Sequence, residues 1–233
     1  MLESLKRELR DANESLVKLG LVHNSTTFGN VSSLDESRNY VAIKPSGIKC
    51  ENMNYEHIVI LNLKGDIIEG EKKPSSDTNT HLEIYRNFPE INAIVHTHSS
   101  HAVSFAQAKI PITCLGTTHA DYFHGSIPVI RELTKKEVCK DYELNIGKAI
   151  VETFKNLRIN HLEISACLLH SHGPFIWAKN LEEALEKAFI LEEIAKINFM
   201  TLRLNPSIEP LNSYLMDKHF LRKNGPNAYY GQK

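Results

Sequence analysis

Apolar residues recur every three or four positions along the first segment of the chain, between Leu2 and Leu19. This spacing predicts an amphipathic helix, and Gly20 is placed to end it. The same pattern predicts three further helices, of which one is stopped by Pro89 and the longest is capped by Asn180. Their predicted ranges are residues 78–88, 100–108 and 181 to about 204.

Between these helices lie short runs that are rich in β-branched residues, and such runs predict strands. The predicted strands are residues 40–43, 57–63, 65–70, 91–98, a segment near 127–130 and a segment near 164–170. Because helices and strands are interleaved at irregular spacing, we expect a layered α/β fold with a largely antiparallel or mixed sheet. The chain has no internal repeat or linker-like stretch, so residues 1–233 are interpreted as a single domain.

Composition excludes several classes of partner. The 233 residues carry a formal net charge of −1, which gives no electrostatic reason to expect nucleic acid or an anionic membrane as a partner. The charged start, MLESLKRELR, lacks the apolar core of a signal peptide. The four cysteines stand far apart, which favours reduced thiols and a cytoplasmic protein over a disulfide framework.

The twelve histidines are numerous for this length, and five of them fall in two clusters. His96 and His98 end a predicted strand, where residues two apart face the same side and can begin a zinc site. In the segment LLHSHG, either His170 or His172 could supply a third ligand, and strand alternation does not choose between them. A rival metallohydrolase pattern, H-x-H-x-D-H, fails because Ser100 stands at the aspartate position.

Three small turns offer groups that suit an anion. The segment KPSG (44–47) combines a lysine with a serine, KKPSSDT (72–78) precedes a predicted helix, and FGN (28–30) forms the third turn. Asp77 or Thr78 is expected to cap the helix that follows. Gly65 and Gly70 have the spacing of a phosphate loop, but Glu71 replaces its lysine, and the G-x-G-x-x-G fingerprint of dinucleotide-binding proteins is absent.

Two further segments draw attention. The segment GTTHADYF (116–123) places Asp121 among polar and aromatic residues in a predicted loop. The tail HFLRKNGPNAYYGQK (219–233), which includes Tyr230, is too aromatic for a frayed end. We therefore expect the tail to pack on another surface, such as a neighbouring subunit.

In this order, the segments GN, KPSG, KKPSSDT, HTHS, GTTHADYF, HSHGPF and NAYYGQK resemble the L-ribulose-5-phosphate 4-epimerases of bacterial arabinose and ascorbate utilisation. That family belongs to the class II aldolase/adducin superfamily, and the resemblance covers essentially the whole chain. It implies a three-layer α/β/α fold with a central, mainly antiparallel sheet. It also implies a cytoplasmic homotetramer with active sites at subunit interfaces.

The resemblance implies a role for each matched residue. The ligands of Zn²⁺, or of another divalent metal, would be His96, His98 and His172, with Asp77 as an acidic fourth group. The sugar phosphate would be bound by Gly29, Asn30, Ser46, Gly47, Ser75 and Ser76, with Lys44 nearby. Asp121 and Tyr230 would transfer protons across a subunit interface. Phe28 departs from the family, whose members tend to have Trp there, and residues 156–166 also look divergent.

The implied reaction inverts carbon 4 of a 2-ketopentose 5-phosphate, converting L-ribulose 5-phosphate to D-xylulose 5-phosphate. The hydrogen on carbon 4 is not acidic, so the inversion requires either oxidation or cleavage of the bond between carbons 3 and 4. Without a dinucleotide fingerprint, cleavage is favoured, with a metal as Lewis acid and the phosphate turns holding glycolaldehyde phosphate while its aldehyde rotates.

Three other functions are compatible with the superfamily. A sugar-phosphate aldolase would release the two fragments, but such aldolases tend to carry Glu at the position of Asp77. A non-catalytic domain like the adducin head would lack the metal ligands, all of which are present in this sequence. A dehydratase that acts on a related sugar phosphate is the weakest of the three.

Overall fold

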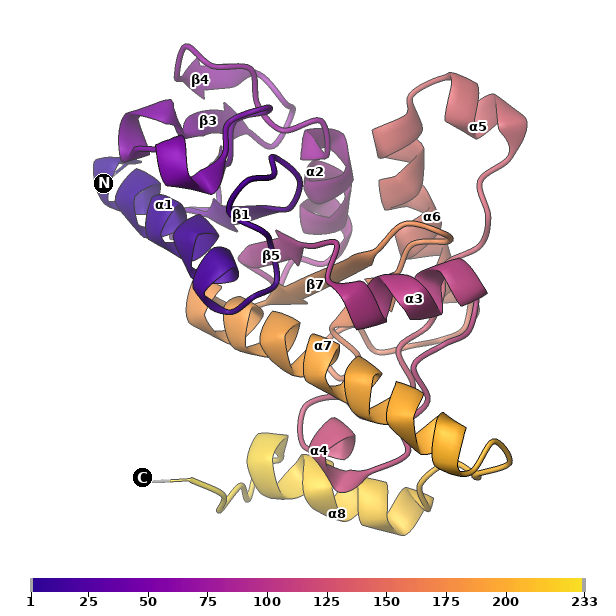
Figure 1. Ribbon diagram of the computed structural model, residues 1–233. Coiled ribbons are helices and arrows are strands. Elements are labelled where there is room, and N and C mark those ends of the chain that lie inside the picture. Colours follow the sequence, from indigo (N-terminus) through magenta and orange to yellow (C-terminus); the bar gives the residue numbers. More distant parts are fainter. Residues whose placement is uncertain (1, 232–233) are drawn as a thin grey trace.

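One antiparallel sheet organises the part of the chain that the computed structural model describes, residues 2–231 (Figure 1). Within that range seven strands pair in the order β4-β3-β2-β1-β5-β7-β6, and each neighbouring pair is antiparallel. The strands are β1 (Asn30–Leu34), β2 (Tyr40–Ile43), β3 (Val59–Asn62), β4 (Ile67–Glu69), β5 (Ala93–His96), β6 (Ala166–Leu168) and β7 (Pro174–Ala178). The α/β class with a central, mainly antiparallel sheet is therefore confirmed.

Helices cover both faces of this sheet and bury its alternating apolar side chains. The helices are α1 (Leu2–Lys18), α2 (Thr78–Asn87), α3 (Ser100–Ala108), α4 (Thr117–Ala120), α5 (Lys135–Cys139), α6 (Tyr142–Asn156), α7 (Leu181–Leu204) and α8 (Ser213–Asn224), with short 3₁₀ turns at Cys50–Asn52 and Tyr55–His57. α1, α3 and α7 pack on one face, whereas α2 and α6 pack on the other. α4 and α8 lie together beyond the sheet, against α7 (Figure 1). Among the helices described, none is long and apolar enough to cross a membrane.

The apolar periodicity located four helices correctly. The helices predicted over 2–19, 78–88, 100–108 and 181–204 are α1, α2, α3 and α7, with ends that differ by no more than a residue or so. The predicted cap of α7 is also confirmed, because the Asn180 side chain accepts a hydrogen bond from the backbone N–H of Glu183 at 2.8 Å. Among the predicted strands, 40–43 is β2, and the runs at 57–63, 65–70 and 91–98 contain β3, β4 and β5.

The predicted strand near 127–130 is wrong. That segment makes only isolated bridges, from Ile127 to Ile112 and from Val129 to Leu168. Pro128 lies between them and has no N–H to donate to a ladder. The strand predicted over 164–170 shortens to β6, and the segment 116–123, predicted as a loop, contains the short helix α4. The patterns also did not reveal β1, β7, α5, α6 or α8.

A carboxylate from α7 holds the start of α3, which directly follows the His96–His98 segment. Glu192 accepts hydrogen bonds from the backbone N–H of His101 at 2.9 Å and of Ala102 at 3.0 Å, and from His101 Nδ1 at 2.8 Å. These backbone groups are the ones that an N-cap side chain normally satisfies, and a negative charge suits this end of a helix. Glu192 thus performs the capping for Ser99, whose side chain makes no cap within residues 2–231.

We expect Glu192→Ala to lower the free energy of unfolding by about 1–2 kcal/mol, because two helix N–H groups lose their acceptor. Urea denaturation measures this change. Glu193→Ala, which removes the neighbouring carboxylate of the same helix, is the control and should change the free energy by less than about 0.5 kcal/mol. Equal effects of the two substitutions would contradict the capping role.

Candidate metal centre and substrate pocket

A pocket of about 370 Å³ at one end of the central strands collects every residue predicted to bind the metal or the substrate. These residues are Gly29, Asn30, Lys44, Ser46, Gly47, Ser75, Ser76, Asp77, His96, His98 and His172. A larger groove of about 770 Å³ lies between α1 and the start of α7, but none of these residues lines it. The smaller pocket is therefore the candidate site.

Backbone pairing brings the distant segments of this pocket together. The register of β1 with β5 sets Asn30 directly opposite His96. The turns KPSG and KKPSSDT also pair, since Ser46 N donates to Lys73 O at 2.9 Å and Ser75 N donates to Lys44 O at 3.0 Å. The two anion-friendly turns thus form one wall beside the end of β5.

Three imidazoles converge in this pocket. His98 Nε2 lies 3.1 Å from His96 Nε2 and 3.1 Å from His172 Nε2, and one nitrogen from each ring falls within 4.8 Å of the others. Two Zn–N bonds of about 2.0–2.1 Å at a tetrahedral angle separate their nitrogens by about 3.3 Å. Both separations from His98 therefore fit ligands of one divalent ion, and all three rings are close enough to form a candidate metal site.

The protonation of these rings also suits a metal. Burial lowers the pKa of all three imidazoles, which keeps them neutral and able to coordinate. His96 Nδ1 lies 2.8 Å from the carbonyl oxygen of Pro174, so Nδ1 carries the hydrogen and leaves the Nε2 lone pair free. Phe28 stacks on the ring of His98 at 4.9 Å between centroids.

Asp77 stands at the N-cap position of α2, as predicted, but within the described chain its side chain does not cap the helix. Its Oδ2 atom instead accepts a hydrogen bond from Asn30 Nδ2 at 2.6 Å. Burial opposes the ionisation of Asp77, but the neighbouring imidazoles and the Asn30 amide outweigh it, so the pKa of Asp77 lies below its ordinary value. The result is a carboxylate that faces the histidines and a helix start where Thr78 N–H donates to Ser75 O, while the N–H groups of Asn79 and Thr80 make no hydrogen bond within residues 2–231.

The structure separates His172 from His170, which strand alternation had placed on one face. β6 ends at Leu168, and the two histidines lie in the tight turn that leads to β7, where Ser171 has a positive φ of 59°. His172 joins the imidazole group, whereas His170 lies 3.9 Å from Glu132 and lines the neighbouring pocket of about 240 Å³, which His172 also borders. The reasoning by alternation was wrong because this segment is a turn and not a strand.

Lys44 is almost fully buried at the wall of the pocket. Its Nζ atom donates to the carbonyl oxygen of Thr27 at 3.0 Å, and burial lowers the pKa of its amine. A cation held in this way beside the serine turns is suited to an anionic group of a ligand.

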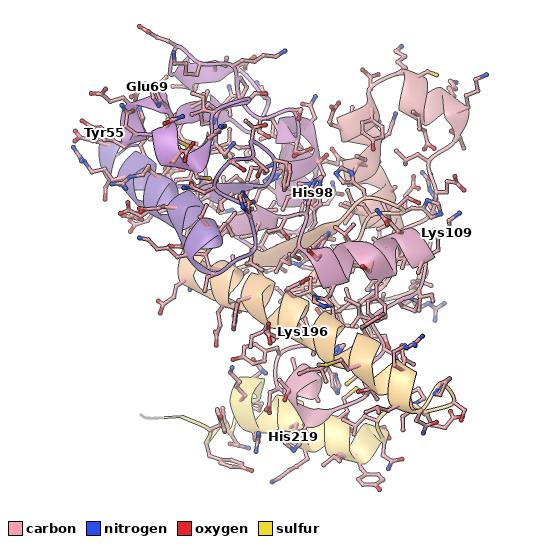
Figure 2. The ribbon with its side chains drawn as sticks, viewed as in Figure 1. Tyr55, Glu69, His98, Lys109, Lys196 and His219 are labelled. Atoms are coloured by element: carbon pink, nitrogen blue, oxygen red, sulfur yellow. The ribbon has the colours of Figure 1, made fainter. Side chains whose placement is uncertain are left out.

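Asp121 and Tyr230 lie together but, in the described part of the chain, outside this pocket. Asp121 accepts hydrogen bonds from Arg222 Nε at 3.0 Å and Nη2 at 2.9 Å, and the guanidinium of Arg222 lies 4.7 Å from the centre of the Tyr230 ring. His219 Nδ1 lies 3.1 Å from the same carboxylate. In Figure 2, His219 on α8 and His98 are well separated. Gln232 and Lys233, the last residues of the NAYYGQK segment, fall outside the described residues.

α8 is anchored by a histidine that binds two carboxylates. His124 Nδ1 lies 2.9 Å from Glu163 Oε2, and its Nε2 lies 2.6 Å from Asp217 Oδ1 on α8. Burial on its own lowers the pKa of His124, but the two hydrogen-bonded carboxylates raise it above its ordinary value. This contact fixes the helix that carries His219 and Arg222.

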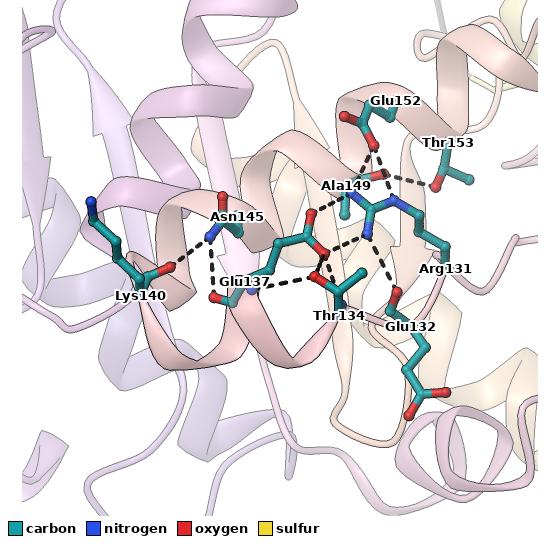
Figure 3. A network of polar contacts seen from close by, with 9 residues as sticks. All are labelled: Arg131, Glu132, Thr134, Glu137, Lys140, Asn145, Ala149, Glu152 and Thr153. Atoms are coloured by element: carbon teal, nitrogen blue, oxygen red, sulfur yellow. Dashed lines mark hydrogen bonds and ion pairs between the residues drawn. The ribbon is translucent and has the colours of Figure 1, made fainter.

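Tyr142 and Glu143 also line the pocket, and the sequence patterns did not single them out. Both open α6, directly after the segment that contains α5. Arg131 ties that segment to α6 by binding Glu137 and Glu152, while Thr134 caps α5 (Figure 3). No sequence motif marks Tyr142 and Glu143, because they reach the pocket only through the tertiary packing of residues 131–142.

Gly173 allows the turn of His172 to approach the strand that carries His96. A Cβ atom on Gly173 would lie 2.6 Å from the backbone oxygen of Thr97. We expect Gly173→Ala to push the turn away and to weaken zinc binding at least about tenfold, as measured by competition with a chromophoric chelator. Gly116→Ala, where a Cβ would meet nothing within 4 Å, should leave zinc affinity unchanged. An undiminished zinc affinity in Gly173→Ala would show that the close approach does not position His172.

Comparison with known proteins shows the family to which the chain belongs. The family described as "Class II Aldolase and Adducin N-terminal domain" matches residues 7–199. An L-fuculose 1-phosphate aldolase structure is 28% identical, with a TM-score of 0.78, and the match covers 93% of this chain and 94% of that one. An L-fuculose-1-phosphate aldolase from Thermus thermophilus is 25% identical with a TM-score of 0.67, covering 90% and 100% of the two chains. A sugar-phosphate aldolase from Thermotoga maritima shares the fold at 23% identity and a TM-score of 0.66, covering 87% and 96%. The chain therefore belongs to the class II aldolase and adducin N-terminal domain family.

Proposed function

We propose that this chain is a zinc-dependent L-ribulose-5-phosphate 4-epimerase, which interconverts L-ribulose 5-phosphate and D-xylulose 5-phosphate. The observation that carries the proposal is the composition of one pocket. Three convergent imidazoles and a carboxylate lie beside two paired turns that suit a phosphate. Its volume of about 370 Å³ suits a small sugar phosphate.

The phosphate is assigned to the wall formed by the two turns. Ser46 and Gly47 lie on one turn, and Ser75 and Ser76 lie on the other, just before the start of α2. The N–H groups of a helix start and the nearby amine of Lys44 favour an anion. Gly29 and Asn30 complete the substrate side of the pocket. The sugar then extends from this wall toward the imidazoles.

The metal is assigned to His96, His98 and His172, with Asp77 as the acidic group beside it. A bound divalent ion would supply Lewis acidity, stabilising the negative charge that develops when the bond between carbons 3 and 4 breaks. The chain's own contribution is to hold the rings in the correct tautomer and to exclude water. The phosphate wall retains the aldehyde fragment while it turns its other face.

Proton transfer is assigned to Asp121 and Tyr230. Within the described residues of a single chain, these two do not line the metal and substrate pocket. Arg222 contacts both side chains and so presents them together. We propose that a homotetramer places this pair at the pocket of a neighbouring subunit. Exposed apolar side chains on α7, among them Phe199 and Leu204, supply a surface that would favour association.

The second candidate function is a sugar-phosphate aldolase, and the solved aldolases of similar fold favour it. The short side chain of Asp77, held by Asn30, and the aromatic tail with Tyr230 favour the epimerase instead. The two activities differ in their products. An epimerase retains glycolaldehyde phosphate, whereas an aldolase releases it together with dihydroxyacetone.

We expect the purified protein to convert L-ribulose 5-phosphate to D-xylulose 5-phosphate in a coupled assay, without net release of glycolaldehyde phosphate. A chelator should abolish the conversion, and added zinc should restore it, because the charge on the cleaved fragment needs a Lewis acid. Stoichiometric release of the two fragments would instead support the aldolase. Full turnover in metal-stripped protein would contradict both.

Subunits with different defects should complement one another if each pocket uses groups from two chains. We expect His98→Ala and Tyr230→Phe each to lose most activity, while Tyr230→Phe and Asp121→Asn keep full zinc content. Mixing equal amounts of unfolded His98→Ala and Tyr230→Phe chains and refolding them should restore about a quarter of wild-type activity, because that share of pockets receives both intact groups. A mixture as inactive as its parents would contradict the shared site.

A further inference from the structure

One face of α2 carries three polar side chains at helical spacing, and β1 meets them with two of its own. Asp77, His81 and Tyr85 are each four residues apart and so lie on one helix face. Asn30 and Ser32 are two apart and face the same side of β1. Asn30 Nδ2 donates to Asp77 Oδ2 at 2.6 Å, and Ser32 Oγ lies 2.7 Å from His81 Nδ1 and 2.8 Å from the Tyr85 hydroxyl.

His81 is wholly buried in this row and sits behind the candidate metal centre. Its ring meets the ring of Phe175 edge-on at 5.4 Å between centroids, and Phe175 in turn stacks on His96 at 4.3 Å. Among the described residues, His81 Nε2 is buried and has no hydrogen-bond partner. A buried polar atom without a partner costs stability, and the place of this one beside the candidate metal centre, next to the carboxylate of Asp77, suggests what would offset that cost.

The hydrogen bonds on the other side of the ring determine what Nε2 offers. The Tyr85 hydroxyl lies 2.8 Å from Ser32 Oγ and 3.5 Å from the carbonyl oxygen of Asn92, and the shorter contact favours donation to Ser32. In this arrangement Ser32 donates its hydrogen to His81 Nδ1, which places the ring hydrogen on Nε2. A helical side chain leans toward the N-terminus of its helix, which for His81 is the direction of Asp77.

We propose that His81 is a positioning residue for Asp77, its Nε2–H being the buried donor that holds the carboxylate when the centre carries its metal. Asn30 secures one carboxylate oxygen, and His81 faces the group from the helix side. Tyr85 and Ser32 act further back, by fixing the tautomer of His81. This inference rests on the proposed metal centre. It predicts that His81, a residue of the core, increases the affinity of that centre for its metal.

The test compares two amides that replace different nitrogens of the ring. His81→Gln places an N–H near the position of Nε2, whereas His81→Asn places its amide near the position of Nδ1 only. Zinc affinity is measured by chelator competition, and the absorption spectrum of the Co²⁺-loaded protein reports the ligand geometry. Outer hydrogen-bond partners of metal ligands are typically worth 10–100-fold in affinity. We therefore expect His81→Asn to bind zinc about 10–100-fold more weakly and His81→Gln to recover most of this loss.

His119 supplies a matched control. It is equally buried, has one nitrogen bonded to the carbonyl oxygen of Gly125 and one without a partner among the described residues, and lies on α4. His119→Asn should leave zinc affinity and the Co²⁺ spectrum unchanged. If His81→Asn does not fold, Ser32→Ala tests the same contact by removing the partner of Nδ1, and it should weaken zinc binding at least severalfold.

The outcomes separate the inference from the proposed function. Zinc affinities for His81→Asn and Ser32→Ala that equal that of wild type would overturn the role of His81 while leaving the metal centre intact. Equal weakening in His81→Gln and His81→Asn would also overturn it, because the loss would then reflect packing. A wild-type protein that binds no zinc would overturn both the inference and the proposed function.

Discussion

The register between β1 and β5 is the constraint on which the site depends. These strands occupy the middle of the sheet, and their pairing sets Asn30 opposite His96. Because side chains alternate along a strand, a slip of one residue would turn Asn30 and Ser32 away from α2 and direct Val31 toward it. In the observed register, Val31 joins the core against α1 and α7, and Asn13 of α1 accepts a hydrogen bond from its backbone N–H at 3.1 Å. The apolar packing of Val31 on one face of β1 thus determines that Asn30 and Ser32 face α2 on the other.

The site is built from groups that have given up ordinary structural partners. Asp77 occupies a cap position, yet its carboxylate turns to Asn30. His81 Nε2 and Asn30 Oδ1 are buried without a partner among residues 2–231. Each such feature sacrifices local stability, and such conflicts concentrate where a protein binds a ligand. Most other buried polar atoms of the described chain are satisfied.

Much of the fold and most of the pocket could be predicted from the sequence, because strong apolar periodicity locates α1, α2, α3 and α7, and compact motifs locate the pocket residues. β1 escaped prediction because its sequence, NVSSL, is polar, although all five residues are buried. The choice of His172 over His170 came from the family resemblance, since only the turn after β6 separates them physically. Tyr142 and Glu143 carry no motif, and their place in the pocket follows from long-range packing. His81 looked like an ordinary helix residue until its neighbours in space were known.

The length of α7 has a further consequence. Its 24 residues span about 36 Å as a straight helix, which packs on β5 and β7 and meets the α4–α8 pair alongside, through Glu186 near its start. Glu192 connects α7 to the start of α3, which directly follows His96 and His98. The α4–α8 pair, which positions Asp121, is therefore held at a fixed distance from the imidazoles of the same chain. Under the proposed function, a lone subunit could load its metal yet remain inert, and catalytic output would depend on protein concentration. Dilution would then switch the enzyme off without unfolding it.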